Sequence, residues 1–186
     1  MNHLGNGVID MPVQNSFNPI NTEELKYYNE YGGFSEDGKE YIIKLNNKNK
    51  LPTVWSHVIA NEKFGTLVTE SMGGFTYSEN SRLNRLTSWS NNPVQDVPSE
   101  IIYIKDKTLN KFWSVGSNPI SDDSDYYIKF GAGYANYSHM NYGILQELDV
   151  FVAKEESAKI NILKLKNTMP EKRTLKLLYY IKPVLR

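Results

Sequence analysis

Short segments with a two-residue hydrophobic period fill the sequence from residue 30 onward and constrain the fold more than any other feature. Apolar and polar side chains alternate, as at Tyr41, Ile43 and Leu45, and glycine, asparagine or proline bounds many of the segments. No long stretch of this region has the hydrophobic period near 3.6 residues that indicates an amphipathic helix. We expect strands over residues 41–45, 54–60, 64–69, 75–77, 101–105, 126–130, 133–142, 144–152, 160–166 and 175–181. Many short strands at close spacing predict an all-β domain, either a sandwich or a barrel.

The N-terminal part of the sequence differs from the rest. Residues 1–20 are rich in asparagine, proline and glycine, and we expect them to form a flexible lead-in to one domain over residues 21–186. A short helix is predicted over residues 22–29, because Asn21 or Thr22 can cap it and two glutamates suit the positive end of its dipole. Gly32-Gly33 is expected to end this helix.

Composition excludes several classes of function. The 21 basic and 21 acidic residues give zero formal net charge, so no bulk field favours nucleic acid. The absence of cysteine excludes disulfides and thiolate zinc sites. Residues 1–10 lack the cationic start and apolar stretch of a signal peptide, and no apolar run approaches about 20 residues, so we expect neither a signal peptide nor membrane contact by this segment. We expect a cytoplasmic location, with a parent enzyme that can be membrane-anchored with a cytoplasmic catalytic region.

Most polar residues that suggest chemistry have a simpler structural interpretation. His3, His57 and His139 lack the spacing of metal ligands, and we expect no cofactor or metal. Aspartates 122, 123 and 125 resemble a D-x-D motif but are typical of a turn before a strand. A glutamate beside a strand end is far more often a surface residue than a catalytic one. The sequence has four of these, Glu70, Glu79, Glu100 and Glu147.

The irregular stretch from Ser78 to Ser99 is the most informative part of the sequence for function, because a loop this long is usually functional or part of an interface. Its arginines can bind sugar hydroxyls or phosphate, its amides can pair with hydroxyls, and its tryptophan can stack on a sugar ring. The candidate substrate-binding residues are Asn80, Arg82, Arg85, Trp89 and Asn91. An equally strong alternative is that these side chains only hold the loop against its own sheet.

Motifs in and around this loop resemble a known family. They are residues 64–71 (FGTLVTES), 73–77 (GGFTY) and 80–94 (NSRLNRLTSWSNNPV), with 31–35, 55–61, 133–134, 146–148 and 150–152 on either side. Together they resemble the N-terminal domain of glycoside hydrolase family 94, formerly glycosyltransferase family 36. Within that family they are most similar to cyclic β-1,2-glucan synthases and β-glucan oligosaccharide phosphorylases.

The resemblance implies an antiparallel β-supersandwich that is galactose-mutarotase-like in shape. The family performs inverting phosphorolysis of β-glucosides without a metal, and inorganic phosphate is the co-substrate. Its general acid lies in a helical barrel that follows the supersandwich, so we expect no catalytic residue in this chain, which then corresponds to a partial domain. The implied partners are a β-glucan oligosaccharide, the catalytic barrel and a second copy in a homodimer.

Three alternatives stay open for the chain by itself. It can be an autonomous carbohydrate-binding module, a purely structural dimerisation domain, or a small mutarotase-like enzyme for which His57 and His139 are the histidine candidates. The last predicted strand, residues 175–181, has a regular apolar face. If the neighbours of this strand lie outside the chain, the edge stays exposed, and we expect self-association that light scattering can measure.

Overall fold

A computed structural model describes the protein over residues 20–46, 48–92 and 94–185. The lead-in expected over residues 1–20 falls outside these ranges, apart from Ile20. The strands are β1 (Gly32–Phe34), β2 (Glu40–Leu45), β3 (Ser56–Ala60), β4 (Phe64–Thr69), β5 (Gly74–Ser78), β6 (Glu100–Asp106), β7 (Lys111–Ser114), β8 (Tyr126–Gly131), β9 (Tyr134–Asn141), β10 (Ile144–Val152), β11 (Lys159–Asn167) and β12 (Leu175–Ile181). The predicted all-β class is confirmed.

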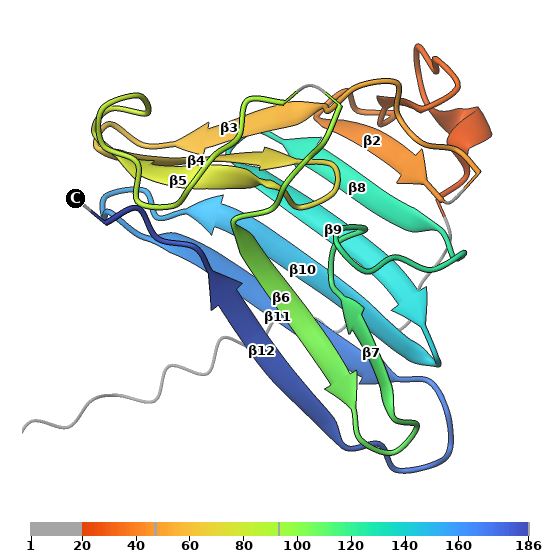
Figure 1. The fold of residues 1–186 in the computed structure, drawn as a ribbon. Helices are drawn as coiled ribbons and strands as arrows, with labels where there is room; N and C mark the ends of the chain where they lie inside the picture. The colour runs from red at the N-terminus through yellow and green to blue at the C-terminus, as the bar shows by residue number, and fades with distance from the viewer. Residues whose placement is uncertain (1–19, 47, 93, 186) are drawn as a thin grey trace, which may run out of the picture.

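The strands form three antiparallel sheets arranged as a sandwich. A six-stranded sheet has the order β1-β2-β8-β9-β10-β11, and two three-stranded sheets have the orders β3-β4-β5 and β12-β6-β7. Figure 1 shows the two smaller sheets over one face of the large sheet. The buried core cluster draws side chains from all three sheets, including Ile43 of β2, Val68 of β4 and Ile104 of β6. The hydrophobic core therefore lies between the layers.

Strand β10 shows how the two-residue period builds this core. Ile144, Gln146, Leu148 and Val150 are buried, whereas the residues between them are half-buried. Successive strand side chains point to opposite faces, so this alternation turns one apolar face of β10 toward the smaller sheets. Burial of each aliphatic side chain contributes about 1.5–3 kcal/mol. The apolar pattern thereby fixes the register of the large sheet.

The structure departs from the sequence-based prediction at the N-terminal side. The expected helix over residues 22–29 is wrong in extent, because only a 3-10 turn, η1 (Thr22–Glu24), forms, with the Asn21 side chain accepting from the Glu23 N–H at 3.2 Å. Gly32 and Gly33 do not simply break a helix. They begin β1, which pairs closely with β2. A side chain at Gly32 would clash with the backbone of β2, so this close pairing requires glycine. No helix in the described part of the chain is long and apolar enough to cross a bilayer.

The last strand, β12, lies at the edge of its sheet and pairs with β6 over its whole length. Leu177 and Leu178 point to opposite faces, yet they are 51% and 53% exposed. Tyr179, Tyr180 and Ile181 are exposed to a similar degree. The structure thus shows an apolar strand open to solvent on both faces. Self-association through it stays a prediction.

Candidate functional site

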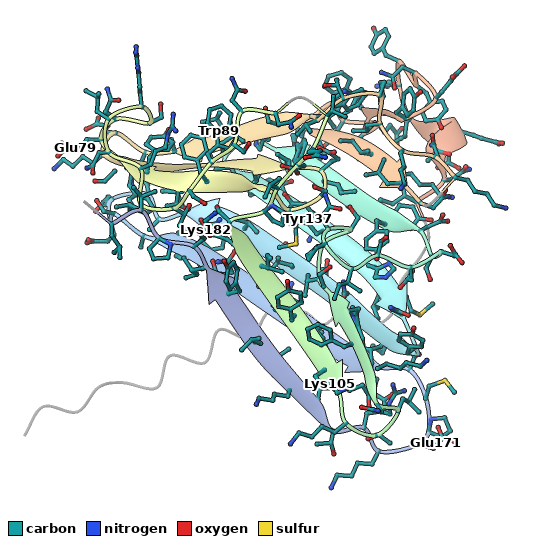
Figure 2. The ribbon with its side chains drawn as sticks, in the orientation of Figure 1. Glu79, Trp89, Lys105, Tyr137, Glu171 and Lys182 are labelled. Carbon is teal, nitrogen blue, oxygen red and sulfur yellow. The ribbon has the colours of Figure 1, made fainter. Side chains whose placement is uncertain are left out.

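The predicted substrate loop, residues 78–92, connects β5 toward β6 and is held at several points by backbone hydrogen bonds. The Ser78 N–H donates to the Asn84 carbonyl at 3.0 Å, which closes the loop on itself. The Ser88 N–H donates to the Lys182 carbonyl at 3.0 Å, and the Val184 N–H donates to the Leu86 carbonyl at 3.0 Å. Trp89 and Lys182 mark these two segments in Figure 2. The loop is therefore fixed between its own sheet and the segment after β12.

Asn80 shapes the loop from within. Its Oδ1 accepts hydrogen bonds from the backbone N–H groups of Arg82 and Leu83, both at 2.9 Å. This is the geometry of an asparagine that stabilises a turn. The acceptor oxygen of Asn80 is already used by the backbone, so this residue is placed to hold the loop.

Arg85 and Trp89 form one packed unit on β5. The Arg85 guanidinium carbon lies 5.3 Å from the ring centroids of both Phe75 and Trp89, and these two rings are 4.9 Å apart. The Arg85 Nε donates to the Ser81 carbonyl at 2.9 Å. The cation–π contacts and this hydrogen bond hold the Arg85 side chain against the two rings. The structure brings these two predicted residues together, in a contact that also holds the loop.

Arg82 and Asn91 have different surroundings. Both are exposed. Within the described ranges, neither side chain has a hydrogen bond or ion pair. Arg82 and Asn91 are therefore exposed members of the predicted set whose side chains make no polar contact within the described ranges.

A polar cavity of about 340 Å³ lies where four connections between strands meet. Its walls come from the β2–β3 connection, the turn after β4, the segment before β6 and the β7–β8 loop. The lining includes both apolar and hydrogen-bonding groups. These are Leu45, Asn46, Lys50, Leu51, Pro52, Thr53, Val54, Glu70, Ser71, Val94, Asp96, Ser117, Asn118, Ser121 and Tyr126.

Glu70 is the least expected residue of this cavity, because it is only 8% exposed. Its Oε2 accepts from the Trp55 N–H at 3.0 Å. Burial raises the pKa of Glu70 to about 7, the hydrogen bonds from its own N–H and from Trp55 oppose this rise, and the nearby charge of Asp96 adds to it. The interpretation of Glu70 as a surface residue is wrong.

Glu100 is also withdrawn from solvent, but it lies in a fully paired environment. Its Oε2 accepts from Lys159 Nζ and from Tyr179 Oη, both at 2.8 Å, and its Oε1 accepts from Thr87 Oγ1 at 3.0 Å. Burial by itself would raise the pKa of Glu100, but the Lys159 charge and the hydrogen bonds outweigh it and lower the pKa. Glu100 therefore has a structural role that its position at a strand end did not indicate.

The histidines do not form an accessible acid–base pair. His139 is 1% exposed, with Nε2 at 3.0 Å from Asp122 Oδ2 and Nδ1 at 3.1 Å from the Asp125 carbonyl. His57 Nε2 lies 2.9 Å from the Gly131 carbonyl. Across the described ranges, no group of three or more His, Cys, Asp or Glu side chains is arranged to hold a metal ion.

Comparison with known proteins places this sandwich in a family. A model described as "Glycosyl hydrolase 94, supersandwich domain" matches residues 39–186. The chain belongs to this family. The predicted resemblance is confirmed, and the match covers β2 to β12 together with the cavity and the loop.

Relatives of this supersandwich domain include two named phosphorylases and a synthase. The N,N'-diacetylchitobiose phosphorylases of Vibrio furnissii and Vibrio proteolyticus are each 30% identical to it, over 81% and 78% of the chain. These alignments cover 19% and 18% of the two relatives, so the chain spans about a fifth of their length. The cyclic beta-(1,2)-glucan synthase NdvB of Rhizobium meliloti is 41% identical over 83 residues, which are 45% of the chain and 3% of the synthase.

Sequence reasoning missed the cavity of this supersandwich domain because its groups are far apart in the chain. Asp96 accepts from the hydroxyls of Thr69 and Ser71, which precede it by 27 and 25 residues. The Asn118 Nδ2 donates to Ser71 Oγ at 3.1 Å across 47 residues. Only the folded sheets bring these side chains together. The one available signal was Glu70 within the family-like motif of residues 64–71.

Proposed function

We propose that the chain is the carbohydrate-contacting, non-catalytic supersandwich of an inverting β-glucan phosphorylase or a cyclic β-1,2-glucan synthase-type glycosyltransferase. The observation that carries this proposal is the family match over residues 39–186. The names of the relatives, which are phosphorylases and a synthase, support it. In the proposed parent enzyme a helical barrel carries the general acid, inorganic phosphate is the co-substrate, and two copies form a cytoplasmic dimer.

The surroundings of His139 support a non-catalytic role. A mutarotase-type reaction needs an acid and a base that both reach the sugar. His139 is 1% exposed and lies between Asp122 and Asp125, so a sugar cannot reach its ring without opening the fold. The galactose-mutarotase-like shape is accordingly proposed as a likeness of architecture and not of chemistry.

The proposed carbohydrate contact is the exposed part of the substrate loop. Arg82 can donate a forked pair of hydrogen bonds, and Asn91 can both donate and accept. Both are exposed. Trp89, which lies between them in the sequence, is half-buried. The hydrogen bonds of Asn80 and the packing of Arg85 hold this surface in place. Preorganisation of this kind lowers the entropic cost of binding.

Calorimetric titration of the chain with β-1,2-gluco-oligosaccharides tests the contact. We expect weak binding to the wild-type chain and about tenfold weaker binding for the double variant Arg82→Ala/Asn91→Ala, since a charged hydrogen bond contributes about 1.5–3 kcal/mol. Lys154→Ala, at an exposed position in another loop, is the matched control. Unchanged affinity in the double variant, with an unchanged melting temperature, would show that the loop does not contact the sugar.

An autonomous carbohydrate-binding module would bind in the same way, so binding alone does not separate it from a domain of a larger enzyme. The coding sequence that follows residue 186 separates the two. A helical barrel encoded there supports the enzyme domain, whereas a stop codon or an unrelated domain supports the autonomous module. Polarimetry of a freshly dissolved aldose tests the mutarotase alternative, for which we expect the uncatalysed rate.

A further inference from the structure

The cavity around Glu70 is separate from the exposed loop residues of the proposed sugar contact. Neither Arg82 nor Asn91 lines it. Its volume of about 340 Å³ lies near the lower end of the range of small-molecule sites, about 300–1,000 Å³. A space of this size suits one ring better than a long chain. Its lining also combines apolar side chains, Leu51 and Val54, with carboxyl, amide and hydroxyl groups.

The carboxyl groups of the cavity are not neutralised by a neighbouring cation. Glu70 is 8% exposed and has no ion-pair partner within the described ranges. Asp96 accepts from the hydroxyls of Thr69 and Ser71 and likewise has no ion pair there. Lys50 is the basic residue of the lining, and it is exposed. The cavity therefore has two acidic side chains and one basic side chain, and the basic one is exposed to solvent. This balance of charge disfavours the binding of an anion such as phosphate.

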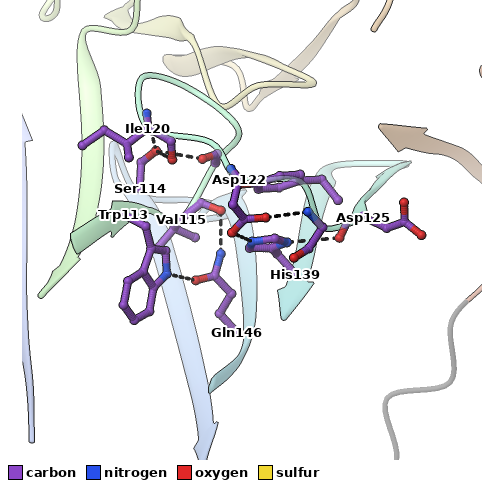
Figure 3. Close-up of polar contacts among 11 residues, drawn as sticks. Trp113, Ser114, Val115, Ile120, Asp122, Asp125, His139 and Gln146 are labelled. Atoms are coloured by element: carbon purple, nitrogen blue, oxygen red, sulfur yellow. Dashed lines mark hydrogen bonds and ion pairs between the residues drawn. The ribbon is translucent and has the colours of Figure 1, made fainter. Parts of the chain in front are cut away.

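The wall formed by the β7–β8 loop is held by a network of side chains, shown in Figure 3. The Gln146 Nε2 donates to the Val115 carbonyl at 2.7 Å, and Trp113 Nε1 donates to Gln146 Oε1 at 2.9 Å. Ser114 Oγ donates to the Ile120 carbonyl at 2.9 Å, which closes the loop that carries Ser117 and Asn118. His139 holds the far end of the loop through Asp122 and Asp125. This wall is therefore preorganised.

Hydrogen bonds also hold the wall of the cavity that carries Glu70 and Asp96. Tyr137 Oη donates to the Thr69 carbonyl at 2.8 Å and fixes the backbone directly before Glu70. The Gly73 N–H donates to Thr69 Oγ1 at 2.7 Å. A Cβ at Gly73 would clash with the Asp96 carboxylate, so the glycine leaves the space in which Asp96 lies. The structure thus places two carboxyl groups beside a polar space, and the burial of Glu70 there has a cost in desolvation.

We propose that this cavity binds one neutral hexosyl unit of a carbohydrate chain, as a second subsite that rests on and deepens the proposed function. Vicinal hydroxyls of the sugar pair with the carboxyl groups of Glu70 and Asp96 and with the amide of Asn118, while Leu51 and Val54 contact its C–H face. Because burial raises the pKa of Glu70 to about 7, its carboxyl group is partly protonated at neutral pH and can donate as well as accept. No set of metal ligands competes for the space within the described ranges.

Amide chemical-shift mapping of the labelled chain tests this proposal directly. The probes are glucose and the β-1,2-linked disaccharide sophorose, with inorganic phosphate and calcium chloride as controls. We expect the sugars to shift the signals of Asn46, Ser71, Ser117 and Asn118. Glu70→Gln should weaken this response about tenfold, whereas Lys154→Ala, in a loop that does not line the cavity, should leave it unchanged. Because Glu70 is buried, Ser121→Trp at the exposed rim serves as a second variant that blocks the mouth without replacing a buried side chain.

The pattern of shifts separates failure of this inference from failure of the proposed function. Shifts confined to residues 80–91 would overturn the cavity subsite and support the loop contact. Shifts caused by calcium alone would identify a cation site and overturn it as well. A sugar response that survives both Glu70→Gln and Ser121→Trp would show that the sugar binds elsewhere. The absence of any shift with either sugar would overturn both the subsite and the loop contact.

Discussion

Glu70 and Glu100 both lie at strand ends and are both withdrawn from solvent, but the two regions around them differ in charge. Glu100 is paired with Lys159 at 2.8 Å and receives further hydrogen bonds from Tyr179 and Thr87. Glu70 accepts from the Trp55 N–H and faces a polar cavity next to Asp96. The surroundings lower the pKa of Glu100 and raise that of Glu70 to about 7. The Glu100 carboxylate is fully paired within the protein, whereas the buried carboxyl group of Glu70 has no cation beside it and is a candidate for a functional role.

The largest effect is expected at the paired centre. Lys159→Met would leave the Glu100 carboxylate buried without its cation, and the side chains of the pair are only 14% and 11% exposed. Breaking such a pair costs about 3–5 kcal/mol, which urea unfolding at neutral pH can measure. Lys154→Met, at an exposed site, should change stability by less than about 0.5 kcal/mol. Equal stability of the two variants would mean that the Glu100 centre is not structural.

A smaller effect of opposite sign is expected at Glu70. Its folded-state pKa of about 7 exceeds the ordinary value of 4.5, so between these pH values the folded protein retains a proton that the unfolded chain has released. Stability therefore falls as pH rises through this window, by roughly 3 kcal/mol in all. Glu70→Gln removes the ionisable group. We expect the variant to be more stable than the wild type at about pH 8 and similar to it below about pH 4.5.

Urea unfolding of the wild type and of Glu70→Gln across this pH range provides the measurement. Asp37→Asn is a suitable control, because Asp37 is an exposed carboxylate whose pKa is lowered by hydrogen bonds from Ser35 and Lys39. The change in stability caused by Asp37→Asn should not have the pH dependence expected for Glu70→Gln between pH 4.5 and about 7. If Glu70→Gln and the wild type show the same dependence of stability on pH, Glu70 is not held in an environment that disfavours its charge, and the contrast with Glu100 is lost.

The smallest effect is expected in the substrate loop, where Arg85 and Arg82 provide a matched pair. Arg85→Ala removes the contact with the Phe75 and Trp89 rings and the hydrogen bond to the Ser81 carbonyl, so we expect a loss of about 1–2 kcal/mol in stability. Arg82→Ala removes an exposed side chain and should cost less than about 0.5 kcal/mol. Thermal melts compare them. A larger loss for Arg82→Ala would reverse the assignment of the two arginines.

Most strands could be predicted from the sequence because they follow from local pattern. β4, β10 and β12 have the predicted bounds, since apolar and turn residues mark both ends of these segments. β7 was missed because it is only four residues long and has two apolar residues, Phe112 and Trp113, which are too few to show a two-residue period. The predicted helix ended early because the chain at Lys26 bridges to Phe34.

The candidate site was less predictable than the fold because burial and pairing are properties of the assembled sheets. The loop residues were proposed from their chemistry, but only the structure separates Arg85, which packs on β5, from the exposed Arg82. Nothing local distinguishes Glu70 from Glu100. Lys159 lies 59 residues from Glu100, and no sequence pattern indicates which lysine forms the pair.

Phosphorus NMR of the chain with inorganic phosphate and β-1,2-gluco-oligosaccharides distinguishes a non-catalytic domain from a phosphorylase. The proposed function is that of a supersandwich domain that contacts carbohydrate without converting it. We expect that no sugar 1-phosphate accumulates above the protein-free blank. Sustained formation of glucose 1-phosphate, lost in a chain that carries Glu70→Gln, would contradict it and would make Glu70 a catalytic residue.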